Sequence, residues 1–412
     1  MSIRADYLDP VDPSANLALQ RAQITTWACY FALFISGAGT TLIGPSLAGL
    51  ALRFGWPIEN TGWFPALQSA GIMIGVIVGG ALLDRFGARG AMVVGVLMVC
   101  VGMWLFSLTS VILLAFGGVL AFGCGFGLLT VGPNVIIQLL NPSHEAAALN
   151  RLNIFYGIGA IIGPQIANFA LSHDNYALGY MITGTLTLTL SILMAQVSVR
   201  PPPNLPHGQK NASDTPRSIV LTKWLMILPF AVALFIYVGI EVGYTSWIST
   251  QMQLVSLSSA AIGALATSIF WGGLTAGRGS ASLLLRRFSN QQLLLGTSLI
   301  TIVGVCFLLI GARSEFVALI CTFIIGVGLG PVFPTTFALV GSLYPAARGS
   351  LSGVLIAIGS VGSIVLPPLQ GQIGAGHNGG MILTLVGAFI LFGLFSVIIR
   401  QTVLRPNVVS AN

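Results

Sequence analysis

The sequence predicts an all-α membrane protein with twelve transmembrane helices in two six-helix, pseudo-symmetric bundles. Of its 412 residues, 55% are hydrophobic and only 7% are charged, and the mean hydropathy is +0.93. Soluble domains carry roughly 25% charged residues, so a soluble fold is excluded. The apolar residues fall into stretches of about 20, the length that crosses a bilayer. The two halves of the chain also repeat one another, as described below.

Twelve apolar stretches are expected to cross the membrane, and the loops between most of them are short. In chain order they are residues 24–51, 60–83, 90–110, 112–140, 146–171, 177–199, 222–250, 259–284, 290–311, 315–340, 348–372 and 379–400. The segment 200–221 is long, polar and rich in proline, so it is the expected linker between two bundles. The predicted organisation is a tail (1–23), a first bundle (24–199), the linker (200–221), a second bundle (222–400) and a tail (401–412).

Lysine and arginine are distributed unevenly over the expected loops. Fifteen of the 17 lie on the side of the N-terminus, and only Arg53 and Arg313 lie on the other. Because cytoplasmic loops carry the excess of basic residues, both termini are expected in the cytoplasm. This placement explains the net charge of +7 without nucleic acid. The expected location is the plasma membrane, in a bacterium the inner membrane.

The halves of the chain match at an offset of 201–203 residues, in the same order throughout. The matching positions are Gly71 and Gly75 with Gly273 and Gly277, Gly123, Gly125 and Gly127 with Gly326, Gly328 and Gly330, and Gly159 and Pro164 with Gly362 and Pro367. Parallel six-span repeats with a binding site at their interface are typical of secondary transporters.

Glu241 is the only one of ten acidic residues inside an apolar stretch. A carboxylate at membrane depth is costly, and such residues mark ion and substrate pathways. We therefore expect Glu241 to carry a proton, or else to be a structural carboxylate bonded to its neighbours. At the repeat offset its counterpart in the first half is Thr40.

The loop GGALLDRFGARG at 79–90 resembles the signature loop of the major facilitator superfamily. Its matching residues are Gly80, Asp84, Arg85, Gly87 and Arg89. The resemblance implies the major facilitator fold and a gate on the cytoplasmic side. Gly80 is expected to let a neighbouring helix approach, and Asp84 to pair across the bundles when the transporter opens outward.

Three further segments resemble the fucose–galactose–glucose:proton symporter family: RLNIFYGIGAIIGP at 151–164, YVGIEVGYTSW at 237–247 and GPVFPTTFALVGSLYP at 330–345. This resemblance implies sugar transport coupled to protons. The chain departs from the family in lacking an acid in the first span and in having Thr130 where the fourth span carries one. Glu241 is then the one carboxylate left for coupling.

The expected solute site lies between the bundles, at mid-depth. Amides suit hydroxyl-rich solutes, and aromatic rings offer flat faces with polar edges. The candidates are Asn134, Asn153, Tyr156, Glu241, Tyr244, Trp247, Trp271 and Arg278. Arg278 lies about 13 Å along its helix from Arg287, inside the membrane. It either extends to the interface or is a buried cation that binds an anionic group or pairs with an acid. The span limits place Glu241 nearer the outside, so a direct Glu241–Arg278 pair is not expected.

These features predict a secondary transporter for a small polar organic solute, a sugar or related compound, working by alternating access. The coupling ion is expected to be H+, with Na+ left open. The alternative is a proton-coupled exporter of drugs or lipid-like molecules. An enzyme is not expected, because the four histidines do not cluster with cysteines or acids. No metal or cofactor is predicted. The expected partners are the solute and the bilayer, with the protein working as a monomer.

Overall fold

The computed structural model describes residues 13–173, 175–196, 222–311, 313–344, 347–374 and 379–404, and every regular element in these ranges is helical. The elements are α1 (Pro13–Thr40), α2 (Ile43–Phe54), η1 (Ile58–Gly62), α3 (Trp63–Leu108), α4 (Ile112–Leu140), α5 (Glu145–Leu171), α6 (Tyr176–Gln196), α7 (Thr222–Leu254), α8 (Ala260–Leu284), α9 (Asn290–Gly311), α10 (Glu315–Leu329), α11 (Val332–Leu343), α12 (Arg348–Gly374) and α13 (Gly379–Leu404). The predicted linker 200–221 and most of both predicted tails lie outside the described residues.

The helices confirm the twelve predicted crossings. Among the described residues, nine helical segments are long and apolar enough to span a bilayer, and α1 with α2 forms a tenth span that bends by 44°. The long helix α3 supplies two crossings, because Gly87 interrupts it with φ 70° and ψ 171°. The helix α6 covers most of the remaining predicted span, 177–199. The tenth predicted span is divided into α10 and α11 at Gly330 and Pro331.

The two arms of α3 run side by side against α4. Gly79 on the first arm and Gly95 on the second both face Leu128, although eight residues separate each from Gly87. Farther from the turn, Gly71 and Gly102 also pack against neighbouring turns of α4. The positive φ at Gly87 is a backbone conformation that residues other than glycine rarely adopt, which explains why a glycine stands at this turn.

The repeat seen in the sequence is also a repeat of contacts. Gly75 packs against the backbone of Cys124, and its counterpart Gly277 packs against that of Val327. In the same way, Gly159 meets the Phe34 carbonyl and Gly362 meets the Phe235 carbonyl. Each pair of partners is separated by the offset of the repeat, so equivalent helices cross at equivalent glycines. Close approach of backbones at small residues is how membrane helices associate.

The predicted role of Gly80 in helix packing is wrong for this conformation. A Cβ placed on Gly80 would meet nothing within 4 Å, whereas one on Gly75 would collide with the Cys124 carbonyl. We expect Gly75→Ala to destabilise the protein by about 1–3 kcal/mol, the usual cost of overpacking. Gly80→Ala, five residues along the same helix, is the matched control and should leave the melting temperature in detergent unchanged. Equal melting temperatures for both variants would contradict the packing role of Gly75.

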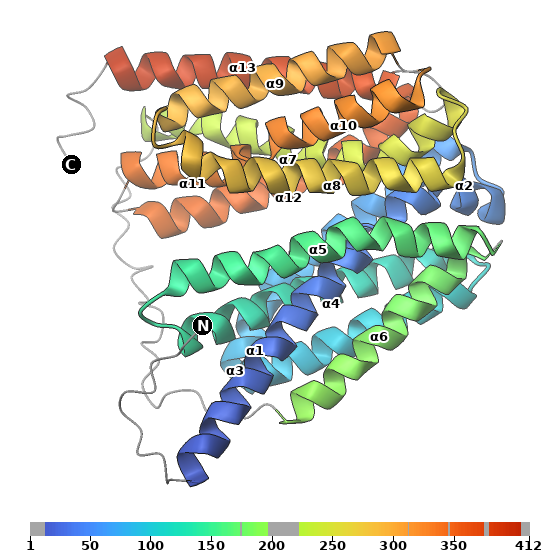
Figure 1. Ribbon diagram of the computed structural model, residues 1–412, viewed down its shortest axis with the longest axis vertical. Helices are drawn as coiled ribbons and strands as arrows, with labels where there is room; N and C mark the ends of the chain where they lie inside the picture. Colours follow the sequence, from blue (N-terminus) through green and yellow to red (C-terminus); the bar gives the residue numbers. More distant parts are fainter. Residues whose placement is uncertain are drawn as a thin grey trace.

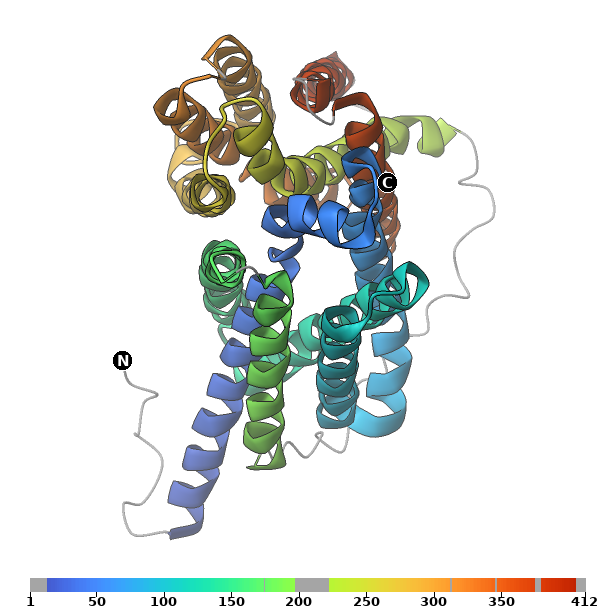
Figure 2. The same ribbon diagram turned by 90° about the vertical axis from the view of Figure 1, so that its right-hand side faces the viewer.

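Two groups of helices are visible in Figure 1, with α7–α13 above α1 and α3–α6, while α2 lies level with α8 at the right. Each group has its own hydrophobic core, and Tyr156 packs against both cores. We call the end that carries α2 and η1 the η1 end, and the end that carries the Asp84–Arg89 turn the Asp84 end. Figure 2 looks onto the η1 end and shows α2 crossing between the groups.

Contacts between the bundles gather at the η1 end. A Cβ on Gly62 would lie 2.7 Å from the Pro367 carbonyl oxygen. The side chain of Gln372 donates a hydrogen bond of 2.9 Å to Asn60. From there α5 follows α8 as far as Gly157, where a Cβ would lie 3.1 Å from the Thr275 hydroxyl. The bundles are therefore joined from the η1 end to about mid-depth.

Arg53 ties together three elements at the η1 end, a role that its position in the sequence did not reveal. It extends from the last turn of α2 and donates from Nη1 to the Ser107 carbonyl, 3.1 Å away, at the C-terminal end of α3. Its guanidinium also lies 4.7 Å from the centre of the Tyr176 ring on α6. A cation near a helix C-terminus and over a ring is favourable on both counts.

We therefore expect Arg53→Gln to lower the free energy of unfolding by about 1.5–3 kcal/mol, the range for hydrogen bonds that involve charged groups. Arg313→Gln is the matched control, since Arg313 is exposed and was predicted on the same side. Thermal denaturation in detergent would compare the two variants. A loss as large in Arg313→Gln as in Arg53→Gln would show that any arginine on this side matters equally.

Candidate functional site

Glu241 and Arg278 form an ion pair between α7 and α8, with Arg278 Nη2 3.6 Å from Glu241 Oε1. The prediction that these two would not meet directly is wrong. The Glu241 side chain is 12% exposed and that of Arg278 is 40% exposed, so the pair lies at the edge of the protein interior. The alternative that Arg278 extends away to the interface is not what the structure shows.

The geometry of two antiparallel helices explains why the pair forms. Glu241 lies about 20 Å from the η1 end of α7, and Arg278 about 27 Å from the start of α8, at 1.5 Å per residue. Side chains on a helix lean towards its N-terminus. Glu241 therefore leans towards the Asp84 end, and Arg278 leans towards the η1 end. The long arginine side chain then bridges the remaining difference in depth.

A stripe of α8 residues faces the first bundle. It consists of Ser268, Trp271, Thr275 and Arg278, whose spacing of three and four keeps them on one face of the helix. Ser268 accepts a hydrogen bond of 2.9 Å from Gln165 and donates one of 2.7 Å to the Ile161 carbonyl. These bonds join α5 to α8 on the η1 side of the ion pair.

Polar and aromatic groups of both bundles meet beside the pair. The Tyr156 hydroxyl lies 3.1 Å from that of Thr40, and its ring is edge-on to the ring of Trp271 at 6.0 Å. The Tyr237 hydroxyl lies beside both Glu241 and Arg278, but no group is in normal hydrogen-bond geometry with it. The Trp271 indole N–H also has no partner in the structure. The centre thus contains buried donors that a polar solute can use.

Two of these residues were missed as site residues. Thr40 matches Glu241 at the repeat offset, so the internal repeat was a signal that could have found it. Tyr237 lies four residues before Glu241, one helical turn away, which places it on the same face of α7. Helical spacing from a known site residue would therefore have indicated it.

Two predicted site residues lie elsewhere in this conformation. Tyr244 is fully buried in the core of the second bundle, where its hydroxyl is 2.9 Å from that of Thr322. Trp247 is the second of these residues, and its indole N–H donates to the Pro367 carbonyl at 2.8 Å. Trp247 packs into the core of the first bundle and so closes the η1 end. Both were predicted from aromatic character alone, which does not distinguish a cavity wall from a core.

The two predicted asparagines bond to their own helices. Asn134 donates to the Thr130 carbonyl at 2.7 Å, and Asn153 donates to the Leu149 carbonyl at 2.9 Å. Asn153 is exposed and lies one turn before Gly157 on the face of α5 that meets α8. Asn134 is half-buried, and the described contacts do not bring it to the ion pair.

The signature turn lies at the Asp84 end. Asp84, Arg85 and Arg89 are exposed, and the Arg85 guanidinium lies 5.3 Å from the centre of the Phe86 ring. The pairing of Asp84 was predicted for a transporter that is open outward, and it stays a prediction.

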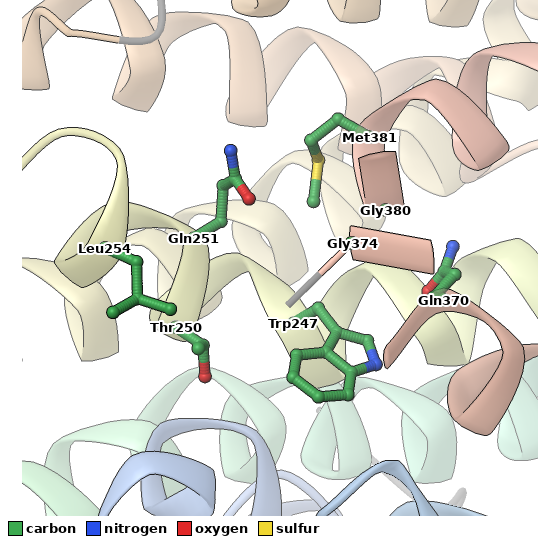
Figure 3. Close-up of a pocket in the computed structure, with 8 residues that line it drawn as sticks. All are labelled: Trp247, Thr250, Gln251, Leu254, Gln370, Gly374, Gly380 and Met381. Atoms are coloured by element: carbon green, nitrogen blue, oxygen red, sulfur yellow. The ribbon is translucent and has the colours of Figure 1, made fainter. Parts of the chain in front are cut away.

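A small pocket lies away from the pair, between α7, α12 and α13 at the η1 end. Figure 3 shows Trp247, Thr250, Gln370 and Met381 around it. The Thr250 hydroxyl and the Gln370 carbonyl oxygen have no partner there. The pocket lies within the second bundle, whereas the ion pair is at the bundle interface. Over the described residues, no group of three or more His, Cys, Asp or Glu is placed to hold a metal ion.

The fold and the interface site together indicate a transporter, and comparison with known families decides which kind. The family model of the Major Facilitator Superfamily matches residues 29–367, most of the chain. The chain belongs to this superfamily. It is a multi-pass membrane protein and a secondary transporter, as the sequence predicted.

Relatives in the superfamily include sugar transporters. The chain is 25% identical over 357 residues to a glucose/mannose transporter of Bacillus subtilis, covering 81% of this chain and 84% of the relative. It is 20% identical over 407 residues to the human sodium-dependent glucose transporter 1, covering 90% and 78%. These matches agree with the resemblance to sugar symporters.

Solved structures of the same fold match nearly the whole chain. A D-xylose-proton symporter has a TM-score of 0.75 at 15% identity, covering 90% of this chain and 97% of the other. A bacterial homologue of the human lysosomal transporter Spinster, in an inward-facing conformation, has a TM-score of 0.75 at 13% identity, covering 93% and 98%. At these identities the likeness shows the fold alone.

Proposed function

We propose that the protein moves a small polar organic solute, a sugar or related compound, across the plasma membrane by ion-coupled alternating access. The observation that carries the proposal is the Glu241–Arg278 pair at the bundle interface, beside the hydroxyls of Thr40, Tyr156 and Tyr237. Charged residues at membrane depth mark solute and ion pathways. The sugar transporters among the relatives support this class of solute.

The proposed orientation has both termini in the cytoplasm of a bacterial inner membrane, following the distribution of lysine and arginine. The η1 end is then external and the Asp84 end cytoplasmic. In this orientation the structure corresponds to an inward-facing state, since the bundles are joined at the η1 end. The exposure of Arg278 and Asn153 towards the Asp84 end fits a path to the cytoplasm.

The proposed coupling ion is H+, and its carrier is Glu241. Na+ is the competing ion, because carboxylate and hydroxyl oxygens also bind hard cations. The proposed partners are the solute and the surrounding lipid, with no other cofactor and with the monomer as the working unit. Cross-linking of the purified protein in detergent or in vesicles would test the monomer.

The proposal is tested by reconstituting the protein in vesicles and measuring uptake of radiolabelled neutral and acidic sugars. Each is driven in turn by a pH gradient, a Na+ gradient or no gradient. We expect accumulation of at least one sugar when the side facing the η1 end is acidic. Failure of every sugar, with pH-driven export of hydrophobic cations in the same vesicles, would replace the proposal by the drug-exporter alternative.

A further inference from the structure

Arg278 is held loosely for a charged group at membrane depth. Its Nη2 is 3.6 Å from Glu241 and its Nε is 3.4 Å from the Gly330 carbonyl oxygen. Strong charge-assisted hydrogen bonds are about 2.7–2.9 Å long, so both contacts are weak. A guanidinium offers five N–H donors in a planar fork that matches a carboxylate. The guanidinium of Arg278 can therefore form shorter and stronger hydrogen bonds with a carboxylate than it now forms.

The position of Arg278 makes that capacity available to a solute. It continues the α8 stripe one turn beyond Thr275, whose hydroxyl would lie 3.1 Å from a Cβ on Gly157 of α5. Pairing Thr275 with Gly157 in antiparallel helices places Asn153 level with Arg278, one turn farther along. Both side chains are exposed, so the bundles diverge at this depth. Arg278 thus lies where the interface opens towards the Asp84 end.

The groups around this point are mainly hydrogen-bond donors. The Trp271 indole N–H is nine-tenths buried and has no partner, and the buried Tyr237 hydroxyl lies beside Glu241 and Arg278 without a hydrogen bond of normal geometry. Together with Arg278 they favour a ligand that is rich in acceptor oxygens. Glu241 is the acceptor that now faces Arg278, and at 3.6 Å it is a poor one.

From this arrangement we infer that the solute is a hydroxylated carboxylic acid, such as a hexuronate, whose carboxylate replaces Glu241 on Arg278. The inference rests on the proposed function and narrows its solute class. When the solute carboxylate binds, Glu241 takes up a proton, so one negative charge still faces Arg278. The empty and loaded sites then carry the same net charge. Transport of one acid with one proton is electroneutral.

The titratable groups that face Glu241 within the described structure belong to three helices. They are Arg278 on α8, Tyr237 on α7 and Tyr156 on α5. The tyrosines are phenols and stay protonated in the range where carboxyl groups titrate. Any increase in acid binding between neutral and mildly acidic pH is therefore assigned to Glu241.

The test compares binding of D-glucuronate and D-glucose, which differ at the oxidised carbon, with galacturonate and galactose as a second matched pair. Isothermal calorimetry or tryptophan fluorescence on the purified protein gives the affinities at pH 5.5 and 7.5. We expect the wild-type protein to bind a uronate at least tenfold more tightly than its hexose, with the preference larger at pH 5.5. Arg278→Gln should lose the preference, and Arg278→Lys should keep part of it. Uptake of the uronate should produce no current on a supported membrane.

Two results would overturn the inference in different ways. Equal or tighter binding of the hexose, or a uronate preference that survives in Arg278→Gln, would reject the acidic solute and leave sugar transport intact. Absence of binding by all four compounds would reject both the inference and the proposed class of solute. If Arg278→Gln does not fold, the double variant Glu241→Gln/Arg278→Gln removes both charges. A uronate preference in that variant would equally contradict the inference.

Discussion

Glu241→Gln is expected to abolish uptake against a gradient while leaving exchange of solute across the membrane. Glutamine keeps the size of glutamate and one acceptor oxygen but cannot exchange a proton. If Glu241 is the proton carrier, the variant still binds solute and still changes conformation, but a pH gradient no longer drives it. Uptake should then stop when the inside and outside concentrations are equal. Measurements of pH-driven uptake and of counterflow in the same vesicles separate the two processes.

The matched control is Glu315→Gln. Glu315 is an exposed carboxylate in the first turn of α10, away from the ion pair, and its replacement should leave accumulation unchanged. Full pH-driven accumulation by Glu241→Gln would exclude Glu241 as the carrier. Loss of both accumulation and counterflow would instead identify it as a residue needed for binding.

The same substitution has a predictable cost in stability, because it leaves Arg278 without its acidic partner. Breaking a fully buried pair costs about 3–5 kcal/mol. Arg278 is 40% exposed, so about 1–3 kcal/mol is the expected loss for this pair. Replacing both residues in Glu241→Gln/Arg278→Gln removes the unpaired charge. The double variant should therefore recover much of the free energy of unfolding that the single variant loses. Melting temperatures of the two single variants and the double variant measure this coupling directly.

The helices were predictable from the sequence because bilayer thickness fixes their length. α4 and α9 have the bounds that were predicted, and the contacts of Gly75 and Gly277 repeat as their sequence positions do. The meeting of Glu241 and Arg278 was not predictable from span limits, because these give depth only to within several residues. The lean of the side chains and the length of arginine decide that contact.

Aromatic residues were the least predictable part of the site. Tyr156, Tyr244 and Trp247 all lie in apolar helices at mid-sequence, and nothing local distinguishes them. Only the packing of α7 against its neighbours places Tyr244 in a core and Trp247 at the closed end. Tyr156 lies at the interface because α5 packs against α8. These outcomes depend on which helix packs against which. The sequence around each residue does not specify such long-range contacts.

Cross-linking Asn60→Cys to Gln372→Cys is expected to stop transport completely. These residues join η1 to α12 through an exposed hydrogen bond of 2.9 Å, at the end where the bundles meet. Alternating access requires this end to open, so a covalent link here holds the protein in the present conformation. In a variant without the five native cysteines, a short bifunctional thiosulfonate reagent should reduce uptake to background. A reducing agent should restore it, because the bonds formed are disulfides.

The controls show whether the link itself is responsible. Each single cysteine treated with the reagent should transport normally. Ser289→Cys with Gln292→Cys, an exposed hydrogen-bonded pair within the second bundle, should tolerate cross-linking. Normal uptake by the linked Asn60–Gln372 pair would mean that the η1 end does not open during transport. The native contacts at this end include the close approach of Gly62 to Pro367, the packing of Trp247 into the core of the first bundle and the exposed Asn60–Gln372 hydrogen bond. The hydrogen bond contributes only about 0.5–1.5 kcal/mol. Solute binding shifts the balance between the two states to the extent that it binds one of them more tightly.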